Sequence, residues 1–359
     1  MNRAMVYFTS FYSNNIFYRN QLITTSIVLV VIWSSILVFV LNAWILLFQE
    51  NVLSYNQSTY LKIISFAIPF YCFNNVVIAV YNGLRKMKIY SLLRGSRWVA
   101  LVLILTLLSV NQPLEITFYS FVSSEVIIFI FNIIFILKAK QLTFISNINP
   151  LIEILRYIRY VYPSQILVAL NENIDVILIE NYVSNETLGV YSFSSKVAKS
   201  LNLIGNAIQT NFNPIVSSCF KNNTINHLKE LCSSLKNISL IVFSFLIVVL
   251  IPLYYLFIEF YLEDLAYISS FKYFILQAIA AGLYASFAWS GGIMIMTGNV
   301  KANIYRAISK LALIIFLVLS TVIILPLDYG VYIGFTLVML AQLFVDRFFI
   351  SKCVGIKIF

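Results

Sequence analysis

Two neighbouring hydrophobic segments of this sequence each carry two charged residues, the acids Glu172 and Asp175 in the first and the lysines Lys196 and Lys199 in the second. A charge that faces lipid costs about 2.5–3.5 kcal/mol even on the lenient insertion scale, so we expect these side chains to face protein or water. If the turn between the two segments centres near Ser184, Glu172 and Lys196 lie level with each other. Each is then about ten residues, or about 15 Å, from the membrane surface. This symmetry predicts a Glu172–Lys196 pair at mid-depth.

Polar side chains continue along both segments at the spacing of one helix face. In the second segment they recur mostly every three or four residues, which is the period of a single stripe. The stripe comprises Ser192, Ser195, Lys196, Lys199, Asn202, Asn206, Gln209 and Asn213, and the partner segment adds Ser164, Gln165, Asn171, Glu172 and Asp175. A stripe across the full membrane thickness predicts a water-filled cavity or pathway. The alternative is that the Glu172–Lys196 pair only holds a helical hairpin together.

Arginines and further polar groups interrupt earlier hydrophobic segments. Arg94 and Arg97 lie one or two turns inside the cytoplasmic end of the third segment. They either snorkel to the lipid headgroups or anchor phosphate, for which a guanidinium group is well suited. Other polar groups inside the segments are Asn74, Asn75, Ser123, Ser124, Glu125, Asn132, Gln277, Ser286 and Ser290.

The composition gives the class of protein. The chain has 359 residues, of which 61% are hydrophobic and 11% charged, and its mean hydropathy is +0.90. A soluble domain is nearer half apolar and a quarter charged, so we predict an all-α, polytopic membrane protein. The net charge of +10 fits basic cytoplasmic loops better than nucleic-acid binding, and we expect membrane lipids and no nucleic acid as partners.

About ten segments are long and apolar enough to span a bilayer as helices. They cover about 23–48, 58–82, 89–110, 114–138, 160–182, 187–213, 236–260, 266–297, 303–326 and 330–351. From them we predict four parts of the chain. These are a cytoplasmic N-terminal segment (1–22), a first lobe of four helices (23–138), a cytoplasmic inter-lobe loop (139–159) and a second lobe of six helices (160–359).

The loops between these segments alternate in charge. One set is basic, and the opposite set is acidic and nearly free of lysine and arginine. The basic set includes Arg85, Lys86, Lys88, Lys138, Lys140, Lys221, Lys229, Lys301, Arg306 and Lys310. The positive-inside rule places the basic loops, and with them both termini, in the cytoplasm.

Motifs of catalysis and of metal binding are absent from the sequence. It has no P-loop, no GxSxG, no HExxH and no pair of carboxylates in a sizeable loop. The four cysteines show no CxxC spacing, and His227 has no second ligand type near it. We therefore expect no enzyme activity, no catalytic residues, no metal site and no cofactor.

Residues 173–218 carry a resemblance to a known family. The stretch combines Asp175 before a short turn, Gly189 and Tyr191 after it, then a small-residue run with lysines and Pro214. In this it resembles the bacterial polysaccharide and O-antigen flippases, whose superfamily also contains the multidrug and toxin extrusion (MATE) transporters. Residues 81–105 and 297–334 resemble other parts of the same family.

The resemblance implies two six-helix lobes around a central cavity that work by alternating access in the bacterial inner membrane. It implies a cargo of undecaprenyl-diphosphate-linked oligosaccharide, an O-antigen or capsule repeat unit, moved from the cytoplasmic to the periplasmic leaflet. Polymerase and chain-length proteins of the same pathway are the implied partners. The cationic candidates for an anionic cargo are Lys196, Lys199, Arg94 and Arg97.

The sequence departs from the family at its start. The family usually has about twelve spans, whereas ten are predicted here, and residues 1–21 resemble the loop that follows the second helix. The resemblance therefore predicts a first lobe without its first two helices.

Two other functions compete with the flippase. A cation-coupled drug or ion antiporter of the same fold would rely on acids in the first lobe, where only Glu125 lies at depth. A membrane polymerase or transferase would need a large outward loop with basic catalytic residues, and the predicted loops are short.

Overall fold

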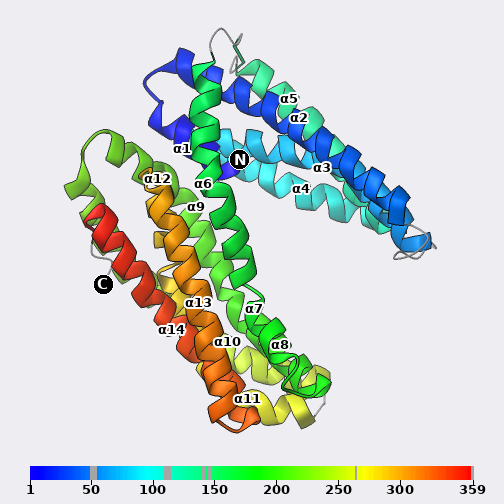
Figure 1. Ribbon diagram of the computed structural model, residues 1–359, viewed down its shortest axis with the longest axis vertical. Helices are drawn as coiled ribbons and strands as arrows, with labels where there is room; N and C mark the ends of the chain where they lie inside the picture. The colour runs from blue at the N-terminus through cyan, green and yellow to red at the C-terminus, as the bar shows by residue number, and fades with distance from the viewer. Residues whose placement is uncertain (49–54, 109–114, 140–141, 144–147, 263–264, 357–359) are drawn as a thin grey trace. The chain divides into compact units, whose positions relative to one another are not determined.

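The computed structural model describes residues 1–48, 55–108, 115–139, 142–143, 148–262 and 265–356. All regular structure in these residues is helical, which confirms the predicted all-α class. The chain divides into two compact units, unit 1 (Met1–Ile158) and unit 2 (Arg159–Phe359). Figure 1 labels the helices of both units.

Unit 1 is built from five helices and the start of a sixth. They are α1 (Asn2–Phe11), α2 (Ile16–Phe48), α3 (Tyr55–Gly83), α4 (Met87–Leu108), α5 (Glu115–Lys138) and α6 (Asn149–Asn171), which continues into unit 2. Helix α3 is central, because α1, α2, α4 and α5 all pack against it.

The first residues of unit 1 are helical rather than a loop. Helix α1 buries Met5 and Phe8 completely, and Tyr7 stacks on Tyr157 of α6 with 4.8 Å between ring centroids. After α1, Tyr12 donates a hydrogen bond of 2.8 Å to Glu153. Burial, and then this hydrogen bond, raises the pKa of Tyr12 well above its usual value. The segment predicted as 1–22 therefore contributes to the core of unit 1.

Unit 2 contains the remaining helices, several of them short or broken. They are α7 (Ile174–Ile179), α8 (Asn185–Lys199), α9 (Leu201–Lys221), α10 (Ile225–Phe257), the π-helical turn η1 (Ile258–Leu262), α11 (Leu265–Ser286), the 3₁₀ turn η2 (Ala288–Gly292), α12 (Ile293–Met296), α13 (Val300–Ile324) and α14 (Leu327–Val354). Helix α11 is central and packs against α8, α9, α10 and α14.

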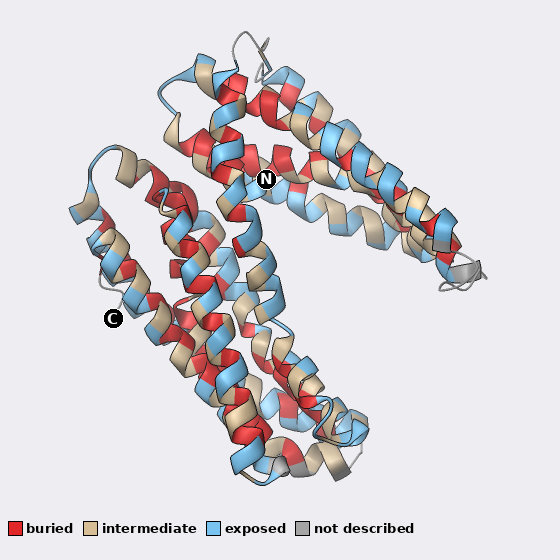
Figure 2. Ribbon diagram, viewed as in Figure 1, coloured by how far each residue is buried: buried red, intermediate tan, exposed pale blue. Residues whose placement is uncertain are grey.

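Small side chains allow this close packing around α11. Ala278, Ala281 and Ala285 are fully buried one turn apart, and Figure 2 shows the buried faces of the helices. A Cβ atom on Gly205 of α9 would lie 2.7 Å from the backbone oxygen of Ala285. Small residues at a membrane helix contact let the backbones approach, which replaces the missing hydrophobic driving force.

Among the described residues, seven helices are long and apolar enough to cross a membrane, or eight if the bent pair of α11 with η2 and α12 counts as one span. That pair bends by 48° between Ser286 and Ala288. Large apolar side chains remain exposed on these helices, for example Phe39, Leu107 and Ile324, as expected for surfaces that face lipid.

Two of the ten predicted spans, 160–182 and 187–213, do not meet this test. The first is interrupted after Asn171, and the second changes from α8 to α9 at Ser200. Helix α6 also begins earlier than predicted, at Asn149, so the loop expected over 139–159 is helical from that residue onward. Each segment was expected to form one straight helix, and polar residues such as Asn173 and Ser200 mark where the helices are interrupted.

Candidate functional site

Two of the four charges that were predicted to lie at mid-depth form an ion pair in unit 2, but the pair is not the predicted one. The ammonium group of Lys199 lies 2.9 Å from the carboxylate of Asp175. Lys196 and the carboxylate of Glu172 are exposed, and neither is ion-paired among the described residues. The predicted Glu172–Lys196 pair is therefore wrong, and the pair lies three residues further along both segments.

The helix break explains the shift. Because α6 ends at Asn171 and α7 begins at Ile174, the backbone oxygen of Glu172 lacks a helical partner and accepts a 2.8 Å hydrogen bond from Lys199. The same ammonium group reaches Asp175 in the first turn of α7. The prediction reflected two straight helices about their turn and did not account for this break.

Two aromatic side chains complete the surroundings of the pair. The hydroxyl group of Tyr191 on α8 donates a 2.8 Å hydrogen bond to Asp175, and the ring of Phe335 lies 5.5 Å from the Lys199 ammonium. Asp175 is 5% exposed, and the Lys199 side chain is 18% exposed. The pair is thus closed on the side of Asp175 and open to its surroundings on the side of Lys199.

The predicted polar stripe separates into an open and a buried part. Lys196 and Asn206 are exposed, while Asn202 is half-buried. Gln209 and Asn213 are each only 8% exposed. The open part therefore runs along α8 and the start of α9, and Asn171 at the end of α6 is half-buried.

The buried part packs against the broken span. A Cβ atom on Gly291 would lie 2.6 Å from the amide nitrogen of Gln209, and one on Gly292 would lie 1.9 Å from the amide oxygen of Asn213. These glycines make room for the two amides. Gln209, which was predicted to line the pathway, lies inside unit 2 against η2.

The amide oxygens of Asn171 and Asn202 are buried, and neither has a hydrogen-bond partner among the described residues. Buried polar atoms are nearly always paired with protein or with water. These two buried oxygens therefore need a partner beyond the described protein groups, such as a bound water.

In unit 1 the predicted phosphate anchors differ in their surroundings. Arg94 is exposed and contacts Tyr90 on its own helix. Arg97 instead forms a 2.9 Å ion pair with Glu125, whose side chain is fully buried. Its guanidinium group also donates to Asn75 at 3.0 Å. Arg97 is therefore committed to contacts within unit 1.

The Arg97–Glu125 pair belongs to a closed network. Asn74 donates to the other carboxylate oxygen of Glu125 at 2.8 Å, and Asn132 donates to Asn74 at 2.8 Å. Both amides are fully buried. The polar interruptions in the second and fourth predicted spans thus meet at one place between α3, α4 and α5.

A second charged cluster in unit 2 was missed by the sequence analysis. Asp346 of α14 accepts a 2.7 Å hydrogen bond from Lys310 and lies 3.4 Å from Arg306, both on α13. Arg306 also donates to the backbone oxygen of Gly291 at 2.9 Å. It thereby satisfies a carbonyl group at the break after α11, as irregular backbone within a membrane protein requires.

This cluster corrects the prediction that Arg306 and Lys310 belong to a cytoplasmic loop. They are only 6% and 8% exposed, and Asp346 is 6% exposed. A signal was present in the sequence, because the two cations are four residues apart on one helix face and Asp346 interrupts an apolar run in the following helix. One acid between two buried cations leaves a surplus positive charge.

No group of three or more histidine, cysteine, aspartate or glutamate side chains is placed to hold a metal ion within the part of the chain that the structure describes. Cys219 and Cys232 are buried, and Cys72 and Cys353 half-buried, as free thiols.

Solved structures provide the fold comparison. A MOP superfamily transporter from Pyrococcus furiosus aligns with a TM-score of 0.79 at 15% identity, over 99% of this chain and 84% of that one. A MATE transporter of Vibrio cholerae in its bent form aligns with a TM-score of 0.76 at 14% identity, over 99% and 85%. The chain has the MATE fold. An outward-facing multidrug resistance MATE transporter also matches, with a TM-score of 0.70 at 15% identity over 99% and 83%.

Comparison with family models and with curated proteins finds no match. The MATE fold and the seven apolar helices together make this chain a multi-pass membrane protein. At these identities the likeness establishes the fold, and the function has to be argued from the charged sites.

Proposed function

We propose that this chain is a flippase. It moves an oligosaccharide linked to undecaprenyl diphosphate from the cytoplasmic to the periplasmic leaflet of the bacterial inner membrane, by alternating access of its two units. The observation that carries the proposal is the state of the buried acids. Among the described residues, Glu125, Asp175 and Asp346 are the buried carboxylates, and each is paired with lysine or arginine.

This pairing favours an anionic cargo over a cationic one. A buried carboxylate that already contacts a cation at 2.7–2.9 Å offers little to a second cation. On α8, Lys196 is exposed and lies three residues before Lys199 of the pair. Its ammonium group is free to attract a phosphate. The diphosphate of a lipid-linked sugar is such an anion.

The predicted cations receive different roles. Lys196 is exposed on α8 of unit 2 and contacts the diphosphate directly, whereas Arg94 is exposed on unit 1 and attracts the cargo in a separate step. Lys199 leaves Asp175 to contact the diphosphate of the cargo and returns to Asp175 when the cargo is released. Arg97 is held by Glu125, so its role is to keep unit 1 folded.

The sugar part of the cargo needs neutral hydrogen-bonding groups. Asn171, Asn202 and Asn206 supply amides on the open part of the stripe, and the first two have oxygen atoms without a partner among the described residues. Amides both donate and accept hydrogen bonds, which suits sugar hydroxyl groups of varied orientation. The polymerase and chain-length proteins of the pathway are the proposed partners.

A cation-coupled drug or ion antiporter is the second candidate. One solved neighbour is described as a multidrug resistance transporter, and Asp175 could bind a cation if Lys199 moved away. This candidate requires the Asp175–Lys199 pair to open during each cycle without an anionic cargo.

The two candidates are separated by transport into proteoliposomes. The purified chain is reconstituted, and a fluorescent undecaprenyl-diphosphate oligosaccharide is followed by quenching from outside. Uptake of ethidium against a proton or sodium gradient is measured in parallel. The proposal expects movement of the lipid-linked sugar and no ethidium transport. Ethidium transport without sugar movement would establish the antiporter, and movement of neither would reject both for this chain.

A further inference from the structure

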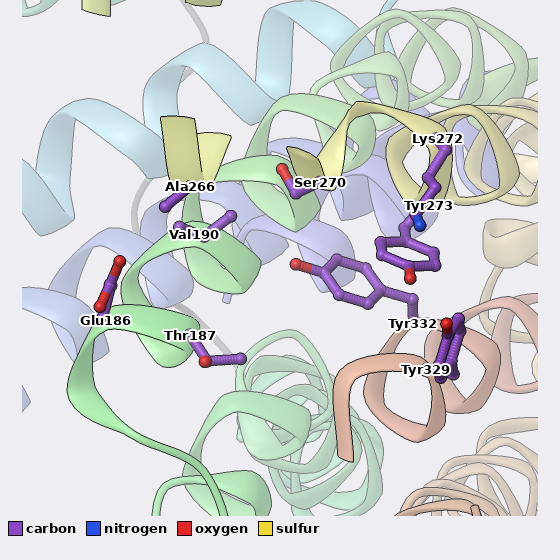
Figure 3. A pocket seen from close by; sticks show the side chains of 9 residues that line it. All are labelled: Glu186, Thr187, Val190, Ala266, Ser270, Lys272, Tyr273, Tyr329 and Tyr332. Carbon is purple, nitrogen blue, oxygen red and sulfur yellow. The ribbon is translucent and has the colours of Figure 1, made fainter. Parts of the chain in front are cut away.

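Unit 2 contains a cavity of about 360 Å³ where the first turns of α8, α11 and α14 meet. Figure 3 shows the side chains that line it, among them Glu186, Lys272 and three tyrosines. Its volume lies toward the lower end of the ~300–1,000 Å³ typical of small-molecule sites. None of these residues belongs to the predicted pathway.

One wall of the cavity is aromatic. Tyr273 stacks on Tyr332 with 4.8 Å between ring centroids, and Tyr329 meets Tyr273 edge-on at 5.4 Å. The hydroxyl group of Tyr332 points toward the space between Ser270 and Thr187 (Figure 3). The cavity therefore combines aromatic surface with hydroxyl groups that both donate and accept hydrogen bonds.

Opposite charges lie at the two sides of this cavity. The ammonium group of Lys272 lies 4.8 Å from the ring centroid of Tyr273 and 5.9 Å from that of Tyr329. Glu186, in the first turn of α8, lies on the other side in Figure 3. The net charge of the lining is zero, because Lys272 and Glu186 are its charged side chains. Lys272 provides a hydrogen-bond donor at one side and Glu186 an acceptor at the other.

This arrangement disfavours both kinds of charged ligand. An organic cation would compete with Lys272 for the tyrosine faces, and an anion near Lys272 would still face Glu186. A neutral ring with many hydroxyl groups can bind donor and acceptor at once. Its polarised C–H groups can also lie against the electron-rich face of a tyrosine ring. We propose that this cavity binds one ring of an uncharged saccharide.

Side-chain contacts link the cavity to the Asp175–Lys199 pair. Tyr332 contacts Tyr191 edge-on at 5.7 Å, and Tyr191 donates its hydroxyl hydrogen bond to Asp175. One aromatic contact and one hydrogen bond therefore link Tyr332, which lines the cavity, to Asp175 of the Asp175–Lys199 pair. A role in transport, as the place where a cargo sugar is held on leaving the pathway, rests on the proposed flippase function.

Ligand binding can be measured directly on the purified chain in lipid nanodiscs. The probes are methyl glycosides of neutral hexoses and N-acetylhexosamines, with tetramethylammonium and inorganic phosphate for comparison, observed by saturation-transfer NMR. The test variants are Glu186→Gln and Tyr329→Ala. Their matched controls are Glu180→Gln and Tyr305→Ala, which also change exposed side chains of unit 2 but do not line the cavity.

We expect at least one neutral glycoside to bind, and each test variant to weaken it about tenfold, the loss typical of one hydrogen bond to a charged group or of one ring contact. The controls should bind as the parent does. Equal binding in test and control variants would overturn the proposal, as would binding of tetramethylammonium or phosphate in place of all glycosides.

The flipping assay on the same preparations separates this proposal from the proposed function. If lipid-linked sugar moves but glycoside binding is unaffected by Glu186→Gln and Tyr329→Ala, the cavity is misassigned and the flippase stands. If glycosides bind as expected but nothing is flipped, the cavity is a saccharide site and the flippase is wrong.

Discussion

The two units each contain a buried ion pair with the same 2.9 Å separation, yet the surroundings of the pairs differ. In unit 1, Arg97 and Glu125 are enclosed with Asn74, Asn75 and Asn132, and the Glu125 side chain is fully buried. In unit 2 the Lys199 side chain is 18% exposed and lies at a helix break. The distance within a pair therefore says little about its role, which depends on what else the two charges contact.

The enclosed Arg97–Glu125 pair is expected to stabilise unit 1, whereas Lys199 of the more open Asp175–Lys199 pair can exchange its partner. Every oxygen of Glu125 is used within unit 1, so separating its pair would leave several groups unsatisfied at once. Lys199 holds one backbone oxygen and one carboxylate beside polar side chains that face outward. The contrast predicts different losses of stability when each pair is changed.

Asp346→Asn extends the comparison to the second buried cluster of unit 2 and should have the largest effect. It leaves Arg306 and Lys310 buried without a counter-charge, and removing one partner of a buried pair costs ~3–5 kcal/mol. We expect the free energy of unfolding to fall by about 5 kcal/mol, the top of that range. Denaturant titration in detergent micelles measures it, with Glu230→Gln, an exposed acid, as the control. A loss no greater than in the control would contradict the structural role of the cluster.

Glu125→Ala tests the closed pair of unit 1. We expect a loss of about 3 kcal/mol, because Arg97 retains Asn75 and the face of Tyr71 as partners. The double variant Arg97→Leu with Glu125→Ala should recover part of the loss, since no buried charge is then left unpaired. The same denaturant titration applies, and a double variant that is less stable than Glu125→Ala would show that Arg97 stabilises unit 1 by other contacts.

Asp175→Asn tests the open pair of unit 2. The amide still accepts from Tyr191, and Lys199 can turn toward its exposed side, so we expect a loss of only about 1–2 kcal/mol. Transport should fall more than stability, because the exchange partner of Lys199 has lost its charge. A loss of stability equal to that of Glu125→Ala would remove the contrast between the two pairs.

Lys196→Gln should leave the free energy of unfolding within about 0.5 kcal/mol of the parent, as for other exposed substitutions. Transport of lipid-linked sugar should nevertheless fall, since an exposed pathway cation is lost. Lys199→Gln is a poorer test of the pathway, because it also leaves Asp175 buried without its cation. Unfolding and transport are measured on the same preparation.

The fold class could be predicted from the sequence, as could the presence of charged residues facing protein within the 173–218 region. Hydrophobic length and charge alternation identify membrane helices, and the stripe on α8 and α9 marks residues that cannot face lipid. The pairing between the lysines and the acids could not be predicted. The helices are interrupted at Asn171–Ile174 and at Ser200, and these interruptions change which lysine contacts which acid.

Ion pairs between different helices could not be predicted from the sequence either. Arg97 and Glu125 are 28 positions apart and join different helices, and nothing in either segment reveals that they meet. Arg306 and Lys310 were assigned to a basic loop because Asp346, the acid that pairs with them, lies in the next helix and cannot be connected to them from the sequence. The tyrosine-lined cavity is formed by three helix starts that are far apart in sequence, so no local pattern indicates it.

The most direct test compares Lys196→Gln with Lys229→Gln in the proteoliposome assay. Both variants remove one exposed lysine of unit 2, but only Lys196 lies on the open stripe beside the Asp175–Lys199 pair. We expect Lys196→Gln to slow the movement of undecaprenyl-diphosphate oligosaccharide about tenfold, as loss of one charge-assisted phosphate contact would, while Lys229→Gln matches the parent. Equal rates in all three proteins would contradict the assignment of this stripe as the path of an anionic cargo.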